Sequence, residues 1–358
     1  MNFLSTFLTV SALFSLIMLL LILLYGPFTK FFTRDKELIT RELVDLPEIS
    51  VVIPTYNEEE NIGGKLDNLE NIDYPMEKLE KIVVDSGSAD RTREIAEEKG
   101  AKVINIKEKG KIKALNRGIK EAKHDDILLT DADVLLKEKS VKNALKYFTG
   151  KVCAVGGRSK VETEILYSEA KKNYHHKDWD QRTRESMIDS TASLDGKFIF
   201  FDKRCIEEIS EKAYTDDLQL TLDIWKKGFR AVIPEDVVVE ERTPDNIKED
   251  IEQMRRRCKL SIANSFQNLD VLRKPSFFSI IIFPMRRLVN YFIPFFLGIV
   301  SVYLLVFNPV VFGLLFLLDL ILSKLKPEIF YYNLLTFVLL LSWKDIIFRR
   351  INRSGIWK

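Results

Sequence analysis

The sequence has little cysteine, which limits the disulfides and thiolate metal sites that it can form. It contains three cysteines, all isolated in the chain: Cys153, Cys205 and Cys258. None belongs to a C-x-x-C pair, so the spacing predicts neither a disulfide framework nor a zinc site. Histidine is equally scarce, with three residues too scattered for a metal cluster. This usage favours a reducing compartment.

Several ligand-binding motifs are also absent. No G-x-G-x-x-G follows a predicted strand and no G-x-x-x-x-G-K-[ST] occurs, so the dinucleotide fingerprint and the P-loop are missing. There is no G-x-S-x-G, which excludes the nucleophile elbow of the α/β-hydrolases. The net charge of +2 gives no indication of a nucleic-acid partner.

Charge is missing altogether from residues 3–25 and 288–318, although the region between them is highly charged. The first stretch is long enough to cross a bilayer as a helix. It lacks the basic start and the cleavage site of a signal peptide, so residues 1–29 are predicted to be a retained membrane anchor. Basic residues follow at once in the linker 30–46, which predicts that the next domain is cytoplasmic in a protein of the cell membrane.

The second uncharged stretch predicts a C-terminal transmembrane region over residues 288–348. Residues 288–307 can cross, Asn308-Pro309 ends that helix, and residues 310–323 form a shorter return. The apolar run 329–343 is marginal in length: either it crosses, or it lies partly in the interface. Residues 274–287 are expected to form an interfacial segment in contact with membrane lipids.

The region between the membrane segments alternates strands with helices. ISVVIP (49–54), KIVVD (81–85), KVINI (102–106) and ILLTDAD (127–133) are β-branched or aliphatic runs, and helix-like segments separate them. This spacing predicts an α/β fold with a mainly parallel sheet. We divide it into two halves, residues 47–150 and residues 151–273.

Polar side chains gather at the predicted carboxyl ends of these strands, where parallel sheets bind ligands. Asp131 and Asp133 would point the same way from an extended segment. Two carboxylates aimed at one point suit a divalent cation and its phosphate ligand, although a strand that merely ends in a polar turn is the alternative.

Six segments, in this order and spacing, resemble the family-2 glycosyltransferases: VVIPTYNEEENI, VVDSGSADRT, KGKIKALNRG, LLTDADV, TDDLQLTLDIWKKGFR and QMRRRCKL. The resemblance covers roughly residues 48–270, and with the flanking apolar runs the chain is similar to the membrane-integrated branch that includes cellulose and hyaluronan synthases. The resemblance implies a GT-A (Rossmann-like) fold and a glycosyltransferase that uses a nucleoside-diphosphate sugar, with UDP-sugars expected. It also implies that residues 47–150 bind the nucleotide-sugar and that residues 151–273 carry the acceptor and catalytic residues.

The resemblance also implies the donor site. Within it, these residues match positions that contact the nucleotide-sugar: Pro54, Thr55, Glu58, Asp85, Lys111 and Asp131. Asp85 matches the aspartate that contacts the base. Asp131 and Asp133 match the D-x-D pair, which binds Mg²⁺ or Mn²⁺. The structural alternatives are a helix cap for Asp85, better filled by Ser88 or Asp90, and a solvated helix start for Lys111.

On the acceptor side, Asp217 in TDDLQL matches the general base, which implies an inverted anomeric product. Asp216 replaces the more usual glutamate, and a capped helix start is the alternative for this segment. Gln253 and Arg256 match the diphosphate-binding residues of Q-x-x-R-W, but Arg257 stands where tryptophan is expected. Binding of anionic lipid head groups is the alternative for this basic segment.

We therefore expect an inverting, metal-dependent glycosyltransferase that acts on a lipid-linked or polysaccharide acceptor. The missing tryptophan and the few membrane helices favour transfer of a single sugar over a processive polysaccharide synthase. A non-catalytic regulator that binds nucleotide-sugar is a different class, and the presence of Asp133 and Asp217 argues against it. A transporter is poorly supported, because only Asp319 places a charge within the apolar spans.

Overall fold

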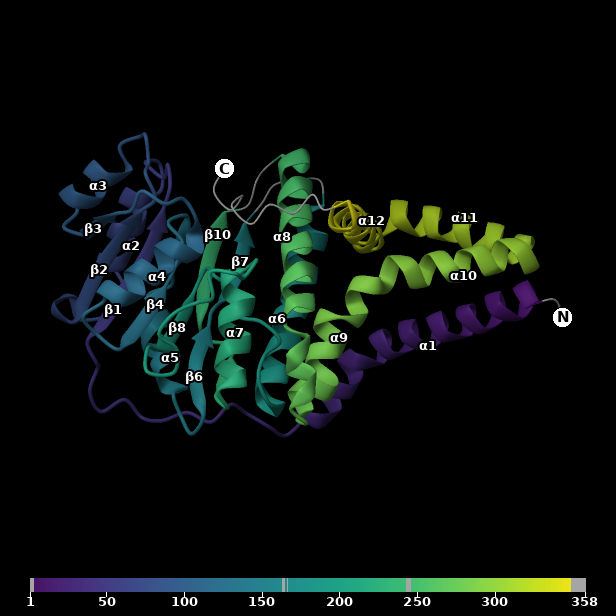
Figure 1. Cartoon of the computed structure of the whole chain (residues 1–358), viewed down its shortest axis with the longest axis horizontal. Helices are drawn as coiled ribbons and strands as arrows, with labels where there is room; N and C mark the ends of the chain where they lie inside the picture. Colours follow the sequence, from purple (N-terminus) through teal and green to yellow (C-terminus); the bar gives the residue numbers. More distant parts are fainter. Residues whose placement is uncertain (1–2, 163–164, 166, 243–245, 349–358) are drawn as a thin grey trace. The chain divides into compact units, whose positions relative to one another are not determined.

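The β-branched run at residues 49–55 forms a strand in which every residue is buried, as expected for the interior of a parallel sheet. This strand, β1 (Ile49–Thr55), lies in a seven-stranded sheet of order β3-β2-β1-β4-β8-β6-β9. The computed structural model describes residues 3–162, 165, 167–242 and 246–348 (Figure 1). Within them, residues 35–162 and 182–242 form one unit, the α/β unit, and the others form a second, the membrane unit.

The large sheet is mainly parallel, as predicted. Its other strands are β2 (Leu79–Asp85), β3 (Lys102–Asn105), β4 (Asp126–Leu129), β6 (Val152–Gly156), β8 (Ile199–Asp202) and β9 (Arg230–Val232). Only β8 runs against its two neighbours, β4 and β6. A second, three-stranded sheet has the order β5-β10-β7, formed by β5 (Val134–Leu136), β10 (Val238–Arg242) and β7 (Arg158–Glu162).

The helices of the α/β unit connect these strands. They are α2 (Ile62–Glu70), the short 3₁₀ helix η1 (Met76–Lys78), α3 (Thr92–Glu98), α4 (Lys111–Glu121), α5 (Ser140–Lys146) and α7 (Asp216–Lys226). Packing of α4 on the sheet requires glycine at one point: a Cβ on Gly118 would lie 2.2 Å from Val52 Cγ1. A larger residue at this position would not allow the helix to approach β1 so closely.

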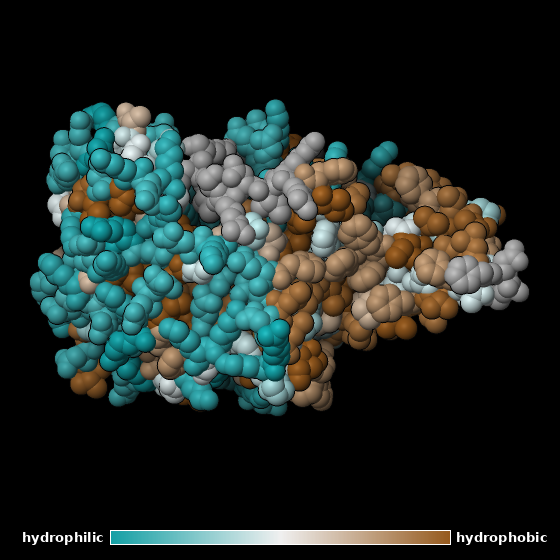
Figure 2. Space-filling view, in the orientation of Figure 1, coloured by the Kyte–Doolittle hydropathy of each residue, from teal (hydrophilic) through white to brown (hydrophobic). Residues whose placement is uncertain are grey.

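The membrane unit is helical. Its elements are α1 (Phe3–Phe32), the first residues of α6 (Ser168–Ile188), α8 (Ile247–Gln267), η2 (Leu269–Arg273), η3 (Phe278–Ile282), α9 (Phe283–Arg287), η4 (Val289–Phe292), α10 (Ile293–Phe307), α11 (Pro309–Leu325) and α12 (Pro327–Ile347). Within the described residues, three helical segments are long and apolar enough to cross a membrane: Leu4–Phe32, Phe278–Phe307 and Pro327–Ile347. Hydrophobic residues cover much of this unit on the face shown in Figure 2.

Among the described residues, three ion pairs connect helices inside the membrane unit, one of them between Arg286 on α9 and Asp178 on α6. Lys171 Nζ on α6 lies 2.6 Å from Asp250 Oδ1 on α8, and both side chains are buried. Arg255 donates two hydrogen bonds, of 2.8 and 2.6 Å, to the carboxylate of Asp345 on α12. A fork of this kind fixes direction as well as distance. These contacts hold the start of α6 and the end of α12 against α8.

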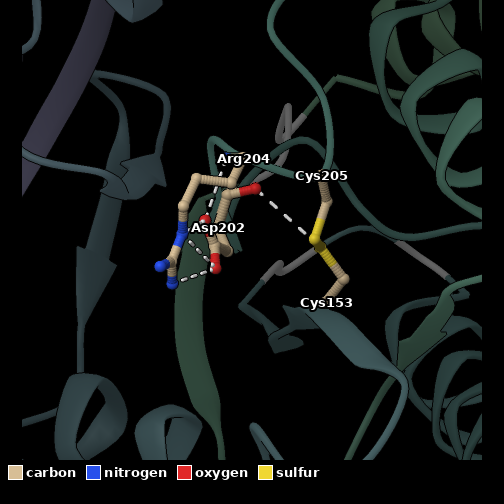
Figure 3. Close-up of a disulfide and its surroundings, with 4 residues drawn as sticks. All are labelled: Cys153, Asp202, Arg204 and Cys205. Atoms are coloured by element: carbon tan, nitrogen blue, oxygen red, sulfur yellow. Dashed lines mark hydrogen bonds and ion pairs between the residues drawn. A yellow bond between two sulfur atoms is a disulfide. The ribbon is translucent and has the colours of Figure 1, made fainter.

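The structure contradicts the expectation that the cysteines form no disulfide. Cys153 on β6 and Cys205, just after β8, are bonded across 52 residues of sequence (Figure 3). The reason is the antiparallel pairing of these strands, which places Ala154 opposite Phe201 and Cys153 Sγ 3.8 Å from the Asp202 carbonyl, three residues before Cys205. Sequence spacing cannot show this pairing, because the two strands are joined by a long connection. Cys258 is a free thiol.

Candidate active site

The carboxyl ends of three adjacent parallel strands carry polar side chains in the α/β unit. Thr55 pairs with Asp85 in the register of β1 and β2, and β4 on the other side of β1 leads directly into Thr130 and Asp131. The edge predicted from the sequence is therefore present. Thr55 is buried, and its hydroxyl lies 3.4 Å from the Val84 carbonyl that accepts its hydrogen bond. Pro54 lies within β1, which continues to Thr55.

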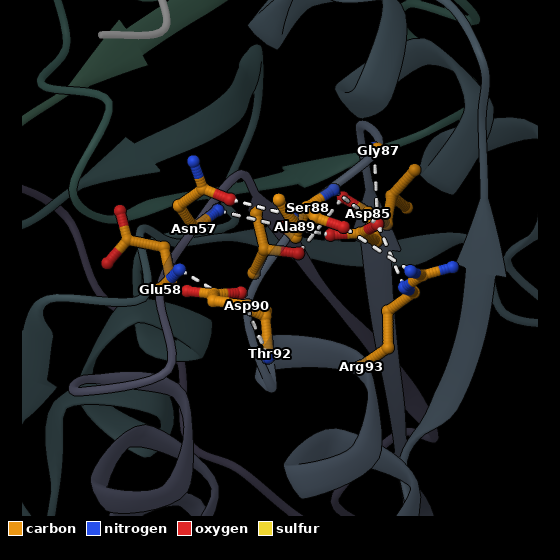
Figure 4. A network of polar contacts seen from close by, with 11 residues as sticks. Asn57, Glu58, Asp85, Gly87, Ser88, Ala89, Asp90, Thr92 and Arg93 are labelled. Atoms are coloured by element: carbon orange, nitrogen blue, oxygen red, sulfur yellow. Dashed lines mark hydrogen bonds and ion pairs between the residues drawn. The ribbon is translucent and has the colours of Figure 1, made fainter.

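Asp85 holds together the loop that follows β2 (Figure 4). Its Oδ2 accepts hydrogen bonds from the main-chain nitrogens of Gly87, at 3.1 Å, and Ser88, at 3.0 Å. Its Oδ1 accepts a further bond from the Ser88 hydroxyl, and Arg93 Nε lies 3.6 Å from Oδ2. The side chain is fully buried. Asp85 therefore fixes the loop and does not cap α3, whose first residue, Thr92, donates instead to Asp90 Oδ1.

The loops after β1 and β2 are tied to each other. Asn57 adopts a left-handed backbone conformation, with φ of 55°, which asparagine tolerates better than most residues. Its main-chain nitrogen donates to Ser88 Oγ at 2.8 Å, and its Oδ1 accepts from the main-chain nitrogen of Ala89 at 2.9 Å (Figure 4). The main-chain nitrogen of Glu58 donates to Thr92 Oγ1 at 2.8 Å. The backbone that carries Glu58 is thus held in one place.

Lys111 connects two acidic segments that lie far apart in the sequence. Its Nζ lies 2.7 Å from Asp131 Oδ1, after β4, and 3.3 Å from Asp216 Oδ2, at the start of α7. Only 15% of the lysine side chain is exposed, so the alternative of a solvated helix start does not describe it. Gly196 leaves room for this contact, because a Cβ there would lie 3.2 Å from Asp216 Oδ2 and 3.3 Å from Lys111 Nζ.

The charges around Lys111 are predominantly negative. Burial raises the pKa of Asp131, and Asp133 and Asp216 raise it further; together they outweigh Lys111, so the pKa stands at about 6. Burial also raises the pKa of Glu58, to which Asp133 and Asp131 contribute. Burial lowers the pKa of Lys111, but the attraction of Asp131 and Asp216 reverses this and leaves it above its ordinary value. Asp131, Asp216 and Asp217 all act on this one lysine.

These residues fit a divalent cation by their chemistry. Mg²⁺ is usually held by one or two protein carboxylates together with phosphate oxygens, so a complete protein cage is not needed. Among the described residues, no group of three or more His, Cys, Asp or Glu side chains is placed to hold a metal ion. Asp131 and the exposed Asp133 are the two carboxylates that would hold the ion. A bound cation would reduce the electrostatic repulsion between the carboxylates of this cluster.

Asp217 occupies the first turn of α7. Its Oδ1 accepts a hydrogen bond of 2.6 Å from the main-chain nitrogen of Leu218, and its carbonyl accepts one of 2.7 Å from Thr221 Oγ1. Acids in the first turn are favoured by the helix dipole. Thr215 precedes the helix with an extended backbone, but its side chain makes no capping bond. The predicted capping alternative is therefore not formed by this threonine.

Two buried lysines near Thr130 were not predicted from the sequence. Lys65 on α2 donates from Nζ to Thr130 Oγ1 and to the Val134 carbonyl, both at 2.8 Å. Lys197 Nζ lies 2.5 Å from Glu241 Oε2 and 3.1 Å from Asp195 Oδ2. A signal for Lys65 was present, because it stands among apolar residues that form the buried face of α2: Ile62, Leu66 and Leu69. Burial lowers the pKa of Lys65 to about 7.

Gln253 and Arg256 lie on α8, in the membrane unit. Burial lowers the pKa of Arg256, and the neighbouring Arg257 lowers it further. The structure thus brings Glu58, Lys111, Asp131, Asp133 and Asp216 into one charged cluster of the α/β unit. The participation of Gln253 and Arg256 in the same site stays a prediction.

Comparison with known proteins identifies this cluster's domain. Residues 50–210 match the family model described as "Glycosyl transferase family 2". The chain carries a family-2 glycosyltransferase domain. The resemblance predicted from the six segments is confirmed, and the domain contains the loops of Asp85, Lys111 and Asp131.

Three curated relatives place the domain among named glycosyltransferases. The probable glycosyltransferase YdaM of Bacillus subtilis is 34% identical over 36% of this chain and 33% of its own length. A dolichyl N-acetyl-α-D-glucosaminyl phosphate 3-β-D-2,3-diacetamido-2,3-dideoxy-β-D-glucuronosyltransferase of Methanococcus voltae is 25% identical over 57% and 70%. The poly-β-1,6-N-acetyl-D-glucosamine synthase of Staphylococcus aureus is 28% identical over 52% and 48%. The match spans only a third of YdaM and about half of the synthase.

A solved structure shows the fold over nearly the whole chain. The mannosyltransferase PcManGT of Pyrobaculum calidifontis, in a complex with GDP-mannose and Mn²⁺, superposes with a TM-score of 0.81. The match covers 96% of this chain and all of that one, at 22% sequence identity. The predicted GT-A fold is confirmed.

Proposed function

We propose that the protein is a membrane-bound, inverting glycosyltransferase that takes a sugar from a nucleoside-diphosphate sugar. The observation that carries this is the contact of Lys111 with both Asp131 and Asp216, which joins the matched family-2 region, residues 50–210, to the start of α7. It joins the strand end expected to bind the donor to the helix that presents Asp217. A site of this kind brings a donor's leaving group and a base to one place.

The donor site uses the strand-end residues. Pro54, Thr55, Glu58 and Asp85 would line the nucleoside pocket, with a UDP-sugar as the expected donor. A divalent cation, Mg²⁺ or Mn²⁺, held by Asp131 and Asp133 would supply positive charge that stabilises the leaving nucleoside diphosphate. Lys111, Gln253 and Arg256 would contact the diphosphate as well, because ammonium and guanidinium groups pair with phosphate oxygens.

The transfer itself needs one base. Asp217 would accept the proton of an acceptor hydroxyl while the oxygen of that hydroxyl forms a bond to the anomeric carbon of the sugar. The bond from that carbon to the diphosphate breaks, and the nucleoside diphosphate leaves. Because the two bonds lie on opposite sides of the carbon, the product has the inverted configuration. Lys111 fixes Asp216 next to this base.

A lipid-linked acceptor is favoured over a growing polysaccharide. Three candidate spans would put the domain next to the membrane, where lipid-linked glycans are presented. The name of the M. voltae relative describes an acceptor of this class. The S. aureus relative is a polymer synthase, so elongation is the second candidate. Arg257, in place of tryptophan, favours single transfer.

One experiment tests the function and separates these acceptors. Membranes that contain the full chain, or the Asp217→Asn variant as the control, are incubated with radiolabelled UDP- and GDP-sugars, with and without EDTA. Products are then separated into lipid-soluble and polymeric fractions. We expect label in the lipid fraction that EDTA and the substitution both abolish. Label confined to polymer would assign the second candidate, and no incorporation from any donor would overturn the function.

A further inference from the structure

Lys65 is a fully buried amine whose hydrogen bonds go to one short segment. It lies on the buried face of α2 and has no exposed surface. Burying such a group is costly unless it is hydrogen-bonded. The two acceptors that it uses, Thr130 Oγ1 and the Val134 carbonyl, are each 2.8 Å away. One nitrogen thus bridges two points that lie four residues apart.

The bridged points are the two ends of the turn that carries Asp131 and Asp133. At its first end, the Thr130 main-chain nitrogen donates to the Val52 carbonyl, and the Thr130 hydroxyl donates to the Lys197 carbonyl. At its second end, Val134 pairs with Glu241 of β10. Lys65 Nζ contacts both ends directly, whereas Lys197 links them through Glu241, which pairs with Val134. The direct bridge between residues 130 and 134 is therefore the side chain of Lys65.

We propose that Lys65 is a positioning residue for the two carboxylates of Asp131 and Asp133. This inference rests on the proposed function, in which the pair holds a divalent cation. The acids of the cluster repel one another, so without a clamp the turn would open and the two carboxylates would separate. Metal ions demand oxygen ligands within a narrow range of distances, and groups behind the ligands set that range.

The same helix supplies a matched control. Asn68, one turn after Lys65, donates from Nδ2 to the Leu136 carbonyl at 2.9 Å and accepts from the Leu136 nitrogen at 2.7 Å. Like Lys65, it makes two hydrogen bonds to the chain beyond β4, but both go to Leu136 and neither goes to Thr130 or Val134. If the only role of Lys65 were to attach α2 to this region, the loss of Asn68 would weaken metal binding to the same extent.

The test measures Mn²⁺ binding and not turnover. Mn²⁺ is titrated into the purified full chain with saturating UDP, and in parallel with GDP, and free Mn²⁺ is followed by electron paramagnetic resonance. We expect Lys65→Met to raise the Kd for Mn²⁺ about tenfold or more, the size usual for groups behind metal ligands. Asn68→Ala should change this Kd less than about threefold, although it also lowers the thermal midpoint.

The outcomes separate this inference from the proposed function. A Lys65→Met protein that binds Mn²⁺ as tightly as wild type, or an Asn68→Ala protein that loses as much affinity, overturns the role of Lys65 alone. Wild type that binds no Mn²⁺ with either nucleotide overturns the metal-dependent donor site as well. If Lys65→Met does not fold, Thr130→Val, which keeps the shape of the side chain, should still weaken Mn²⁺ binding, and unchanged affinity would overturn the proposal.

Discussion

Lys111 Nζ, at the start of α4, lies 2.7 Å from Asp131 Oδ1, in the turn after β4, although the two residues are 20 positions apart in the sequence. The same nitrogen contacts Asp216 at 3.3 Å. Each of the three side chains is largely but not completely buried. The positive charge of Lys111 therefore compensates the negative charges of Asp131 and Asp216. A bound phosphate or metal ion would change the net charge at this point.

Removal of this lysine should make the protein more responsive to metal. In Lys111→Met, the carboxylates of Asp131 and Asp216 lose their counter-charge, so we expect a lower thermal midpoint than in wild type. A divalent cation can replace part of the lost charge, and Mn²⁺ should raise the midpoint of the variant by more than that of wild type. Thermal unfolding of the full chain in detergent, with either Mn²⁺ or EDTA, measures the midpoint and its shift with Mn²⁺. Equal Mn²⁺ shifts in the two proteins would contradict the shared cluster.

Substitution of the candidate base should remove transfer but not donor binding. Asp217→Asn keeps the size of the side chain and loses its basicity, so sugar transfer should fall roughly 10²- to 10⁴-fold. Binding of the nucleotide, measured by calorimetry, should stay within about threefold. Asp223→Asn, further along the same helix, is the control and should retain most activity. Transfer by Asp217→Asn within about threefold of wild type would show that another group is the base.

The sequence was a good guide to the parts of the fold that are local. β1, β2 and β4 occur where short aliphatic runs predicted them, and their polar ends meet because parallel strands share an edge. The sequence pattern predicts that such strands are present, but it does not predict the residues at which they end. β1 continues through Pro54 to Thr55, because the strand's pairing with β2 extends that far.

Features that depend on distant pairing were not predicted. The order β4-β8-β6 and the Cys153–Cys205 bond both arise from strands that are far apart in the sequence. Asp216 was treated only as a substitute for glutamate, but its contact with Lys111 gives it a part in the site. Lys65 was missed because a single lysine within an apolar helix face is usually attributed to its long, flexible side chain reaching solvent.

The disulfide should stabilise the α/β unit. It closes a loop of 52 residues, and a bond of this kind typically contributes about 2–4 kcal/mol to the free energy of unfolding. The double variant Cys153→Ser/Cys205→Ser should therefore unfold at a lower temperature than wild type. Cys258→Ser is the matched control and should change the midpoint little. Denatured, unreduced wild type should react with one equivalent of a thiol reagent per chain, and three equivalents would contradict the bond.

The remaining thiol should react slowly at neutral pH. Burial raises the pKa of Cys258 to about 11, although Arg257 and Arg287 oppose the shift. The thiolate is the reactive form, so a higher pKa means less of it at a given pH. At pH 8 the native chain should be alkylated by iodoacetamide about 100-fold more slowly than the denatured chain, and the rate should still rise between pH 9 and 11. Equal rates for native and denatured protein would show that the thiol is exposed.

Loss of the second carboxylate of the D-x-D pair should abolish the effect of metal on nucleotide binding. Asp133 is exposed on the turn after β4, so Asp133→Ala removes a ligand without opening the core. We expect Mn²⁺ to tighten UDP or GDP binding to wild type and to leave binding to the variant unchanged, as measured by calorimetry with Mn²⁺ or EDTA. Asp125→Ala, before the start of β4, is the control. Nucleotide binding that responds to Mn²⁺ equally in wild type and Asp133→Ala would remove Asp133 from the metal site.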